Sequence, residues 1–216
     1  MHKIWHKILR ALKLLYTDEF NCISCDCELF ERDGSGLCGK CASEIERIGE
    51  VRCVKCGRKL SNESQYCITC MNVSRAFDCA REPFVYDGVA KNIVHSLKFG
   101  GKRYLAPYMA RHMADEYLNC DFNCEAVIPA PMHKKTLRQR GFNQAALLAF
   151  ELADMLKLDY VDDAIVKCKP NLHQSALSGK EREENAKGVY GFGKGKDKLK
   201  GRNVLIVDDV LTTGAT

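Results

Sequence analysis

The stretch VLIVDDVLTTGAT, Val204 to Thr216, decides how the rest of the chain is interpreted. Its opening apolar run predicts a short strand that is buried on both faces, as in a parallel sheet. Two carboxylates, Asp208 and Asp209, follow the strand, and a loop of small residues comes next. Ligands of open α/β sheets bind beyond the carboxyl ends of strands, where small-residue loops can hold phosphate and adjacent carboxylates can hold hydroxyls or Mg²⁺. The pattern predicts a sugar-phosphate site, with a buried strand and an ordinary turn as the alternative.

The composition is that of an ordinary globular protein. The 216 residues are 46% hydrophobic and 28% charged, and this length accommodates one medium domain and a small one. No run approaches the ~20 apolar residues that span a bilayer. Residues 1–20 predict an amphipathic helix and not a signal peptide, because basic residues are scattered through them. This helix either packs on its own protein or lies with its basic face on the inner surface of the membrane.

Eight of the thirteen cysteines form four C-x-x-C pairs in the first third of the chain. Without an export signal, such pairs favour metal binding in the reducing cytoplasm over disulfides. One pair places two thiolates on one side of a tetrahedral Zn²⁺, and a second pair closes the site. The spacing therefore predicts a double zinc ribbon over residues 21–78, with two structural zinc ions.

The expected zinc ligands follow from pairing consecutive C-x-x-C motifs, although pairing across the two ribbons stays open. They are Cys22, Cys25, Cys38 and Cys41 for the first site, and Cys53, Cys56, Cys67 and Cys70 for the second. Cys27 lies so close to Cys25 in the sequence that we expect no role for it.

Residues 79–216 predict an α/β domain, because short apolar runs alternate with helical patterns. A strand is expected at residues 126–128. A helix is expected from about residue 143 to residue 157, burying Ala146, Leu147, Phe150 and Met155. Residues 88–150 hold nine Lys and Arg against four acids, and the basic loop after the strand is a candidate phosphate cradle or simply a solvated loop. The polar residues 169–189 predict a mobile loop that closes over substrate.

These motifs stand in an order that resembles one family. After the cysteine pairs come LKFGGKRYLAPYMA, PAPMHKKTLRQRGFNQA, LSGKEREENAKG and VLIVDDVLTTGAT. In this series the chain is similar to the ComF (ComFC) family of competence-associated proteins, which carry a type I phosphoribosyltransferase domain. The resemblance implies a zinc-bearing front domain and a site for phosphoribosyl pyrophosphate (PRPP) with Mg²⁺. It also implies a cytoplasmic role in the uptake of single-stranded DNA during natural transformation.

The resemblance further implies roles for individual residues. Asp208 and Asp209 would hold the ribose and Mg²⁺. The 5′-phosphate would be held by Thr212, Thr213, Gly214, Ala215 and Thr216. The other expected substrate-binding residues are Ala130, Pro131, Met132 and His133 of the pyrophosphate loop, Arg140 of the family-specific RGFNQ motif, and Arg182 and Asn185 of the mobile loop.

Two functions are compatible with these features. The first is phosphoribosyl transfer to an acceptor that the sequence does not identify. The second is a non-catalytic adaptor that binds single-stranded DNA or a DNA-translocating competence protein through the basic segment 88–150. The fold would ordinarily continue beyond Thr216 with a helix and at least one strand, so we expect a C-terminally truncated parallel sheet.

Overall fold

The computed structural model describes residues 21–30, 33–169 and 188–211. The expected helix over residues 1–20, the loop residues Arg182 and Asn185, and the small-residue loop Thr212–Thr216 lie outside these ranges and stay predictions. Within the described ranges, no helix combines the length and apolar character that crossing a membrane requires.

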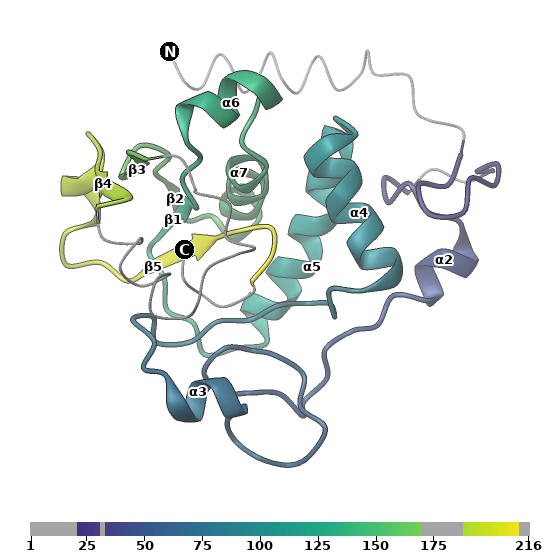
Figure 1. Cartoon of the computed structure of the whole chain (residues 1–216), viewed down its shortest axis with the longest axis horizontal. Coiled ribbons are helices and arrows are strands. Elements are labelled where there is room, and N and C mark those ends of the chain that lie inside the picture. Colours follow the sequence, from purple (N-terminus) through teal and green to yellow (C-terminus); the bar gives the residue numbers. More distant parts are fainter. Residues whose placement is uncertain (1–20, 31–32, 170–187, 212–216) are drawn as a thin grey trace.

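Three parallel strands form the centre of the second half of the chain, which confirms the predicted α/β fold class (Figure 1). The strands are β1 (Ala126–Pro129), β2 (Asp159–Tyr160) and β5 (Val204–Val207), in the order β2–β1–β5. All residues of β1 are buried, because β1 is the central strand and both of its faces are covered. The apolar runs in the sequence therefore located the two longer strands correctly. The prediction that Val204–Val207 is buried on both faces was wrong, because β5 is at the edge of the described sheet and Ile206 is 59% exposed.

The two faces of β1 contribute to separate hydrophobic clusters, as the alternation of side chains along a strand requires. Val127 packs on one face with Leu148 and Leu152. Ile128 packs on the opposite face with Val161 and Ala164. The strand is thus held from both sides, which fixes the position of its carboxyl end.

Alanines allow two helices to pack closely against this sheet. Helix α5 (Ala106–Leu118) and helix α7 (Gln144–Leu156) share one core cluster, to which α5 gives Ala110 and α7 gives Ala149. Small side chains at four-residue spacing leave room for close helix packing. The buried face of α7 consists of Gln144, Ala145, Leu148, Ala149, Leu152 and Ala153. The predicted buried face was wrong, since Met155 is 38% exposed and Ala146, Leu147 and Phe150 are only half-buried.

Three further described helices of this part precede β2. Helix α4 (Gly88–Phe99) and the 3₁₀ helix η1 (Arg103–Leu105) precede α5. Helix α6 (Lys134–Arg140) occupies most of the stretch predicted as a basic loop. It begins after His133, whose Nδ1 accepts a hydrogen bond from the Lys135 amide at 3.2 Å.

Strands β3 (Ile165–Lys167) and β4 (Tyr190–Phe192) form a separate antiparallel pair, and the 3₁₀ helix η3 (Lys196–Leu199) follows. The Cys168 amide donates a hydrogen bond to the Val189 carbonyl oxygen at 2.7 Å. The two flanks of segment 170–187 therefore lie side by side.

The cysteine-rich half consists of two similar units without long strands. The pairs Cys22/Cys25 and Cys53/Cys56 lie in tight turns, while the second pair of each unit begins a short helix, α2 (Gly39–Ser43) or α3 (Ile68–Asn72). The first unit packs on α4 through a hydrophobic cluster that includes Cys22, Leu37, Cys41, Val89, Ile93 and Leu105. This packing joins the first unit to the α/β part.

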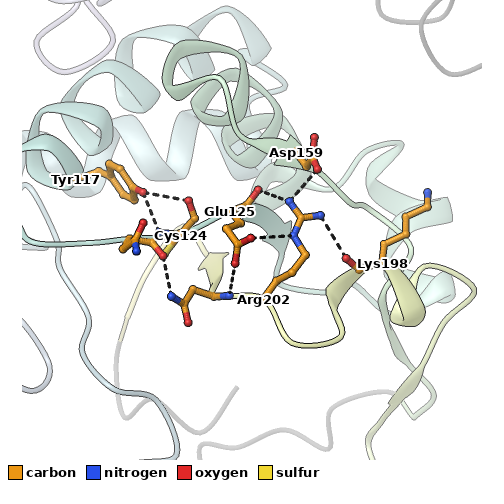
Figure 2. Close-up of polar contacts among 8 residues, drawn as sticks. Tyr117, Cys124, Glu125, Asp159, Lys198 and Arg202 are labelled. Carbon is orange, nitrogen blue, oxygen red and sulfur yellow. Dashed lines mark hydrogen bonds and ion pairs between the residues drawn. The ribbon is translucent and has the colours of Figure 1, made fainter.

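Arg202 ties the amino ends of the three parallel strands together (Figure 2). Its Nη2 donates to the Glu125 carbonyl oxygen at 2.7 Å and to Asp159 Oδ2 at 2.8 Å, and its Nη1 donates to the Lys198 carbonyl oxygen at 3.3 Å. Tyr117 adds a hydrogen bond from the Cys124 amide to its hydroxyl oxygen at 3.1 Å. The network fixes the end of the sheet opposite the acid pair.

Candidate functional site

The parallel pairing of β1 with β5 brings the two predicted phosphate-site segments together. Pro129 and Val207 are register partners at the carboxyl ends of the strands. The Ala130 amide then donates a hydrogen bond to the Val207 carbonyl oxygen at 2.8 Å, immediately before Asp208. The segment 130–133 and the acid pair therefore leave the same edge of the sheet, where open α/β sheets bind ligands.

The second acid of the pair is nearly enclosed. The Asp209 side chain is 5% exposed, and its Oδ1 lies 2.9 Å from Lys98 Nζ. Its other oxygen, Oδ2, is buried and accepts no hydrogen bond within the described part of the chain. A buried carboxylate oxygen without a donor is an unsatisfied acceptor, which a hydroxyl group or a hard cation can satisfy.

The first acid is partly buried and ionises less readily than usual. Its Oδ1 accepts a hydrogen bond from the Asp209 amide at 2.9 Å. Burial raises the pKa of Asp208 to about 6, and the neighbouring Asp209 carboxylate contributes to the rise. A nearby positive charge would favour the ionised form, so the environment of Asp208 suits a bound cation.

Two lysines that the sequence analysis did not single out lie near the acids. Lys98 comes from the last turn of α4 and pairs with Asp209. Lys167 of β3 lies near Asp208; burial lowers the pKa of Lys167, and the Asp208 carboxylate opposes this shift. Neither lysine is near the acids in the sequence. The one sequence feature that could have indicated Lys98 was the basic LKFGGK motif, and Lys167 had none.

Residues of the RGFNQ motif, 140–144, form contacts with segment 130–133 and with the neighbouring helices. The Arg140 guanidinium lies 5.0 Å from the centre of the Phe99 ring, and its Nη1 donates to Gln144 Oε1 at 2.7 Å. Asn143 Oδ1 accepts from the amide of Ala145 at 3.1 Å, and Asn143 Nδ2 donates to the Ala130 carbonyl oxygen at 3.0 Å. Arg140 and Asn143 thus connect α4 and α7 with the loop expected to bind pyrophosphate.

The predicted substrate-binding residues of this loop remain accessible in part. Ala130 is buried, whereas Pro131, Met132 and His133 are half-buried. Three exposed cations follow on α6, namely Lys134, Lys135 and Arg138. The structure brings segment 130–133 beside Asp208 and Asp209, while Arg182, Asn185 and Thr212–Thr216 lie outside the described residues.

A cavity of about 730 Å³ adjoins the segment that follows the acid pair. It is lined by residues 58–61 of the second cysteine unit, by Glu82, and by Val210 and Leu211. Burial raises the pKa of the Glu82 carboxyl to about 7, and Arg58 opposes this rise. The cavity therefore joins the cysteine-rich half to the carboxyl edge of the sheet.

The two cysteine clusters have the dimensions of tetrahedral zinc sites. Each of them contains four sulfur atoms within 4.8 Å of one another, from Cys22, Cys25, Cys27 and Cys38 in the first and from Cys53, Cys56, Cys67 and Cys70 in the second. A Zn–S bond of about 2.3 Å gives a tetrahedral S···S edge of about 3.8 Å. The sulfur separations of Cys25 from Cys38 and of Cys56 from Cys67 are both 3.7 Å. Four thiolates close each coordination sphere, so the clusters fit structural zinc.

The first cluster differs from the expected ligand set at one position. Cys27, for which no role was expected, is a member of the compact group. Cys41 lies next to the group, because its amide donates a hydrogen bond to Cys38 Sγ at 3.5 Å and it packs with Cys22 in one hydrophobic cluster. The assignment of Cys41 as a ligand stays a prediction, and Cys27 is a second candidate for the same coordination position.

Comparisons with known proteins agree with this architecture. Residues 11–71 match a family model described as a double zinc ribbon domain. Competence protein F of Haemophilus influenzae is 28% identical over 202 residues, covering 91% of this chain and 87% of the relative. Competence protein ComFC of Streptococcus pneumoniae is 30% identical over 196 residues, covering 87% and 80%. DNA utilization protein YhgH of Escherichia coli is 25% identical over 186 residues, covering 84% and 80%.

The fold and the clusters define an α/β protein with a parallel sheet and a zinc-ribbon front part. Its similarity to the curated relatives extends over both parts. The chain belongs to the family of competence proteins F and ComFC. No solved structure matches the chain.

Proposed function

We propose that this protein binds PRPP with Mg²⁺ at the carboxyl ends of β1 and β5. The observation that carries the proposal is the buried acceptor Asp209 Oδ2, on the segment that follows Val207, whose carbonyl oxygen accepts a hydrogen bond from the Ala130 amide. Hard oxygen ligands of this kind suit Mg²⁺ or ribose hydroxyls. The donor set therefore fits the ligand that the family resemblance implies.

In this proposal, different groups of residues hold different parts of PRPP. Asp208 and Asp209 hold the ribose hydroxyls and the cation, and segment 130–133 holds the pyrophosphate. Residues 212–216 hold the 5′-phosphate, and Arg182 and Asn185 cover the bound substrate. Arg140 acts as a positioning residue, since its guanidinium is already engaged by Phe99 and Gln144.

Bound Mg²⁺ supplies positive charge that stabilises the leaving pyrophosphate. The protein's part in phosphoribosyl transfer is then to hold the ribose so that a nitrogen acceptor can approach C1 as the bond from C1 to the pyrophosphate oxygen breaks. We assign the acceptor to the cavity beside Val210 and Leu211, which follow the acid pair in the sequence.

The relatives' names connect this site with DNA. Two are named competence proteins and one a DNA utilization protein. We infer that this protein acts in the cytoplasm during DNA uptake in natural competence. PRPP binding provides either the substrate for a transfer reaction or a ligand that regulates binding to DNA or to a DNA-translocating protein.

Calorimetric titration of PRPP in the presence of Mg²⁺ tests the proposal. Asp208→Asn and Asp209→Asn should each weaken binding by about tenfold or more, because each removes a charge-assisted interaction. Asp197→Asn is the matched control, since Asp197 is exposed and lies on η3. Equal affinities for the wild type and both site variants would exclude the acid pair as the PRPP site.

A non-catalytic adaptor is the second candidate, and the exposed cations of α6 favour it. If single-stranded DNA contacts Lys134, Lys135 and Arg138, the triple alanine variant should lower the affinity. It should also reduce the slope of log K against log salt by about 0.7 for each lost contact. Triple alanine substitution of the exposed Lys194, Lys196 and Lys198 is the control, because it removes the same number of positive charges elsewhere on the surface. An unchanged salt slope in the α6 variant would refute DNA binding at this helix.

A further inference from the structure

The first cysteine cluster has a fifth cysteine beside it, Cys41, so that more thiols are at hand than a tetrahedral zinc ion can bind. The sulfurs of Cys22, Cys25, Cys27 and Cys38 lie within 4.8 Å of one another. Cys41 lies beside this group, because its amide donates a hydrogen bond to Cys38 Sγ at 3.5 Å and it packs with Cys22 in one hydrophobic cluster. Cys41 also matches Cys70 of the second cluster in its place one turn after a cysteine cap, so Cys27 and Cys41 are two candidates for the fourth position beside Cys22, Cys25 and Cys38.

The second ribbon shows the same turn without the extra thiol. In the first ribbon the Cys22 amide donates to the Cys27 carbonyl oxygen at 2.7 Å. In the second ribbon the Cys53 amide donates to the Arg58 carbonyl oxygen at 2.8 Å. Cys27 and Arg58 thus occupy equivalent positions, and Arg58 offers no metal ligand. The second cluster, with four cysteines, therefore serves as an internal control for the first.

The backbone at Asp26 directs Cys27 back to the cluster. Asp26 has a φ of 62°, in the left-handed region, where the second ribbon has Gly57 with a φ of 77°. The resulting turn leaves Cys27 Sγ 3.4 Å from Cys25 Sγ. This separation is close to the tetrahedral edge of about 3.8 Å expected for two sulfurs on one zinc ion.

The two candidates for the fourth position differ in their surroundings. Cys41 is 3% exposed and packs in the same cluster as Val89 and Ile93 of α4. Cys27 is exposed. One arrangement therefore completes the zinc site from the protein core, and the other completes it from the solvent side.

We propose that Cys27 and Cys41 are interchangeable fourth ligands of the first zinc ion. Cys22, Cys25 and Cys38 remain bound in both arrangements, and either Cys27 or Cys41 completes the tetrahedron. The first site can therefore release its outer thiol without releasing its metal. The second site has no such reserve, so that loss of one ligand opens its coordination sphere.

Zinc content measured by atomic emission after dialysis against a weak chelator tests this inference. Cys41 and Cys70 are matched positions, because their amides donate to the sulfurs of Cys38 and Cys67 at 3.5 and 3.4 Å. Cys41→Ser and Cys27→Ser should each retain both zinc ions, whereas Cys70→Ser should lose one. The double variant Cys27→Ser/Cys41→Ser should also lose one. Loss of a zinc ion from either single variant of the first site would overturn the exchange.

A second measurement uses the unmodified protein and does not depend on the folding of a variant. The zinc-loaded protein is treated with a limiting amount of iodoacetamide, and modified cysteines are located by mass spectrometry. Cys27 should react more slowly than Cys168, which is exposed and lies outside both clusters, and chelation should abolish this difference. Molecules modified only at Cys27 should keep both zinc ions, because Cys41 takes the vacated position. Reaction of Cys27 at the rate of Cys168, or zinc release on modification of Cys27, would refute the proposal.

Discussion

Lys98 and Asp209 form an ion pair, with Nζ and Oδ1 2.9 Å apart, between the last turn of α4 and the segment after β5. Both side chains are largely shielded from water, at 20% and 5% exposed. Pairs of this kind are screened less by salt than surface pairs. The contact fixes the end of α4 at the acid pair.

Replacing Lys98 with Met should destabilise the protein. The change leaves the Asp209 carboxylate buried without its cation, and loss of one partner from a largely buried pair costs about 2–4 kcal/mol. Urea unfolding of the zinc-loaded protein measures the effect. Lys91→Met on the exposed side of α4 serves as the control. If both variants unfolded at the same urea concentration, Lys98 would not stabilise Asp209.

Asn143 should couple the helix α7 cap to the proposed pyrophosphate loop. Asn143→Ala removes both the cap and the donor to Ala130, and should lower stability by about 1–2 kcal/mol. Asn143→Asp keeps the capping acceptor and loses only the donor. We expect the Asp variant to be more stable than the Ala variant in urea unfolding, yet to bind PRPP more weakly than wild type in calorimetry. An Asp variant with wild-type affinity would show that the contact with Ala130 does not support the site.

The half-buried Arg202 should contribute more to the sheet than the exposed cations near it. Arg202→Ala removes hydrogen bonds to the Glu125 carbonyl oxygen and to the Asp159 carboxylate, and should cost about 1–3 kcal/mol. Lys200→Ala, at an exposed position two residues away, should change stability little. Hydrogen exchange at the amides of β1 and β5 shows whether the stability is lost in these strands. Unchanged protection in Arg202→Ala would argue against a role in holding the strands.

The buried Glu82 carboxyl should make stability depend on pH. Its pKa rises from 4.5 to about 7 in the folded protein, so the folded state binds the proton more tightly than the unfolded state. The stability that this group contributes is therefore present below pH 4.5 and is lost as the pH rises through about 7. Gln cannot ionise, so the melting temperature of Glu82→Gln should rise relative to wild type between about pH 5.5 and 8. A difference that does not vary with pH would contradict the assigned burial.

The strands at the site could be predicted because their sequence signal is local. β1 and β5 are continuous apolar runs, although only β1 is buried along its whole length. β2 has only two residues, Asp159 and Tyr160, and therefore leaves no periodic pattern. Helix α6 was missed because KKTLRQR lacks an apolar face and begins at a histidine cap.

The other differences depend on tertiary structure. Large residues such as Met155 suggested the wrong buried face for α7, because the structure uses Ala149 and Ala153 to bring this helix close to its neighbours. Lys98 reaches Asp209 only after the sheet and α4 have assembled. The cysteine spacing predicted the second cluster completely, whereas the part of Cys27 in the first depends on the left-handed turn at Asp26.

Helix α4 touches the first ribbon at one end and the acid pair at the other. Val89 and Ile93 pack with Cys22 and Cys41, and Lys98 reaches Asp209. A helix of 12 residues is a stiff rod about 18 Å long. If loss of zinc tilted the first ribbon, α4 would tilt with it, and Lys98 would move relative to Asp209. Helix α4 therefore connects the first cysteine cluster with the acid pair at which we propose that PRPP binds.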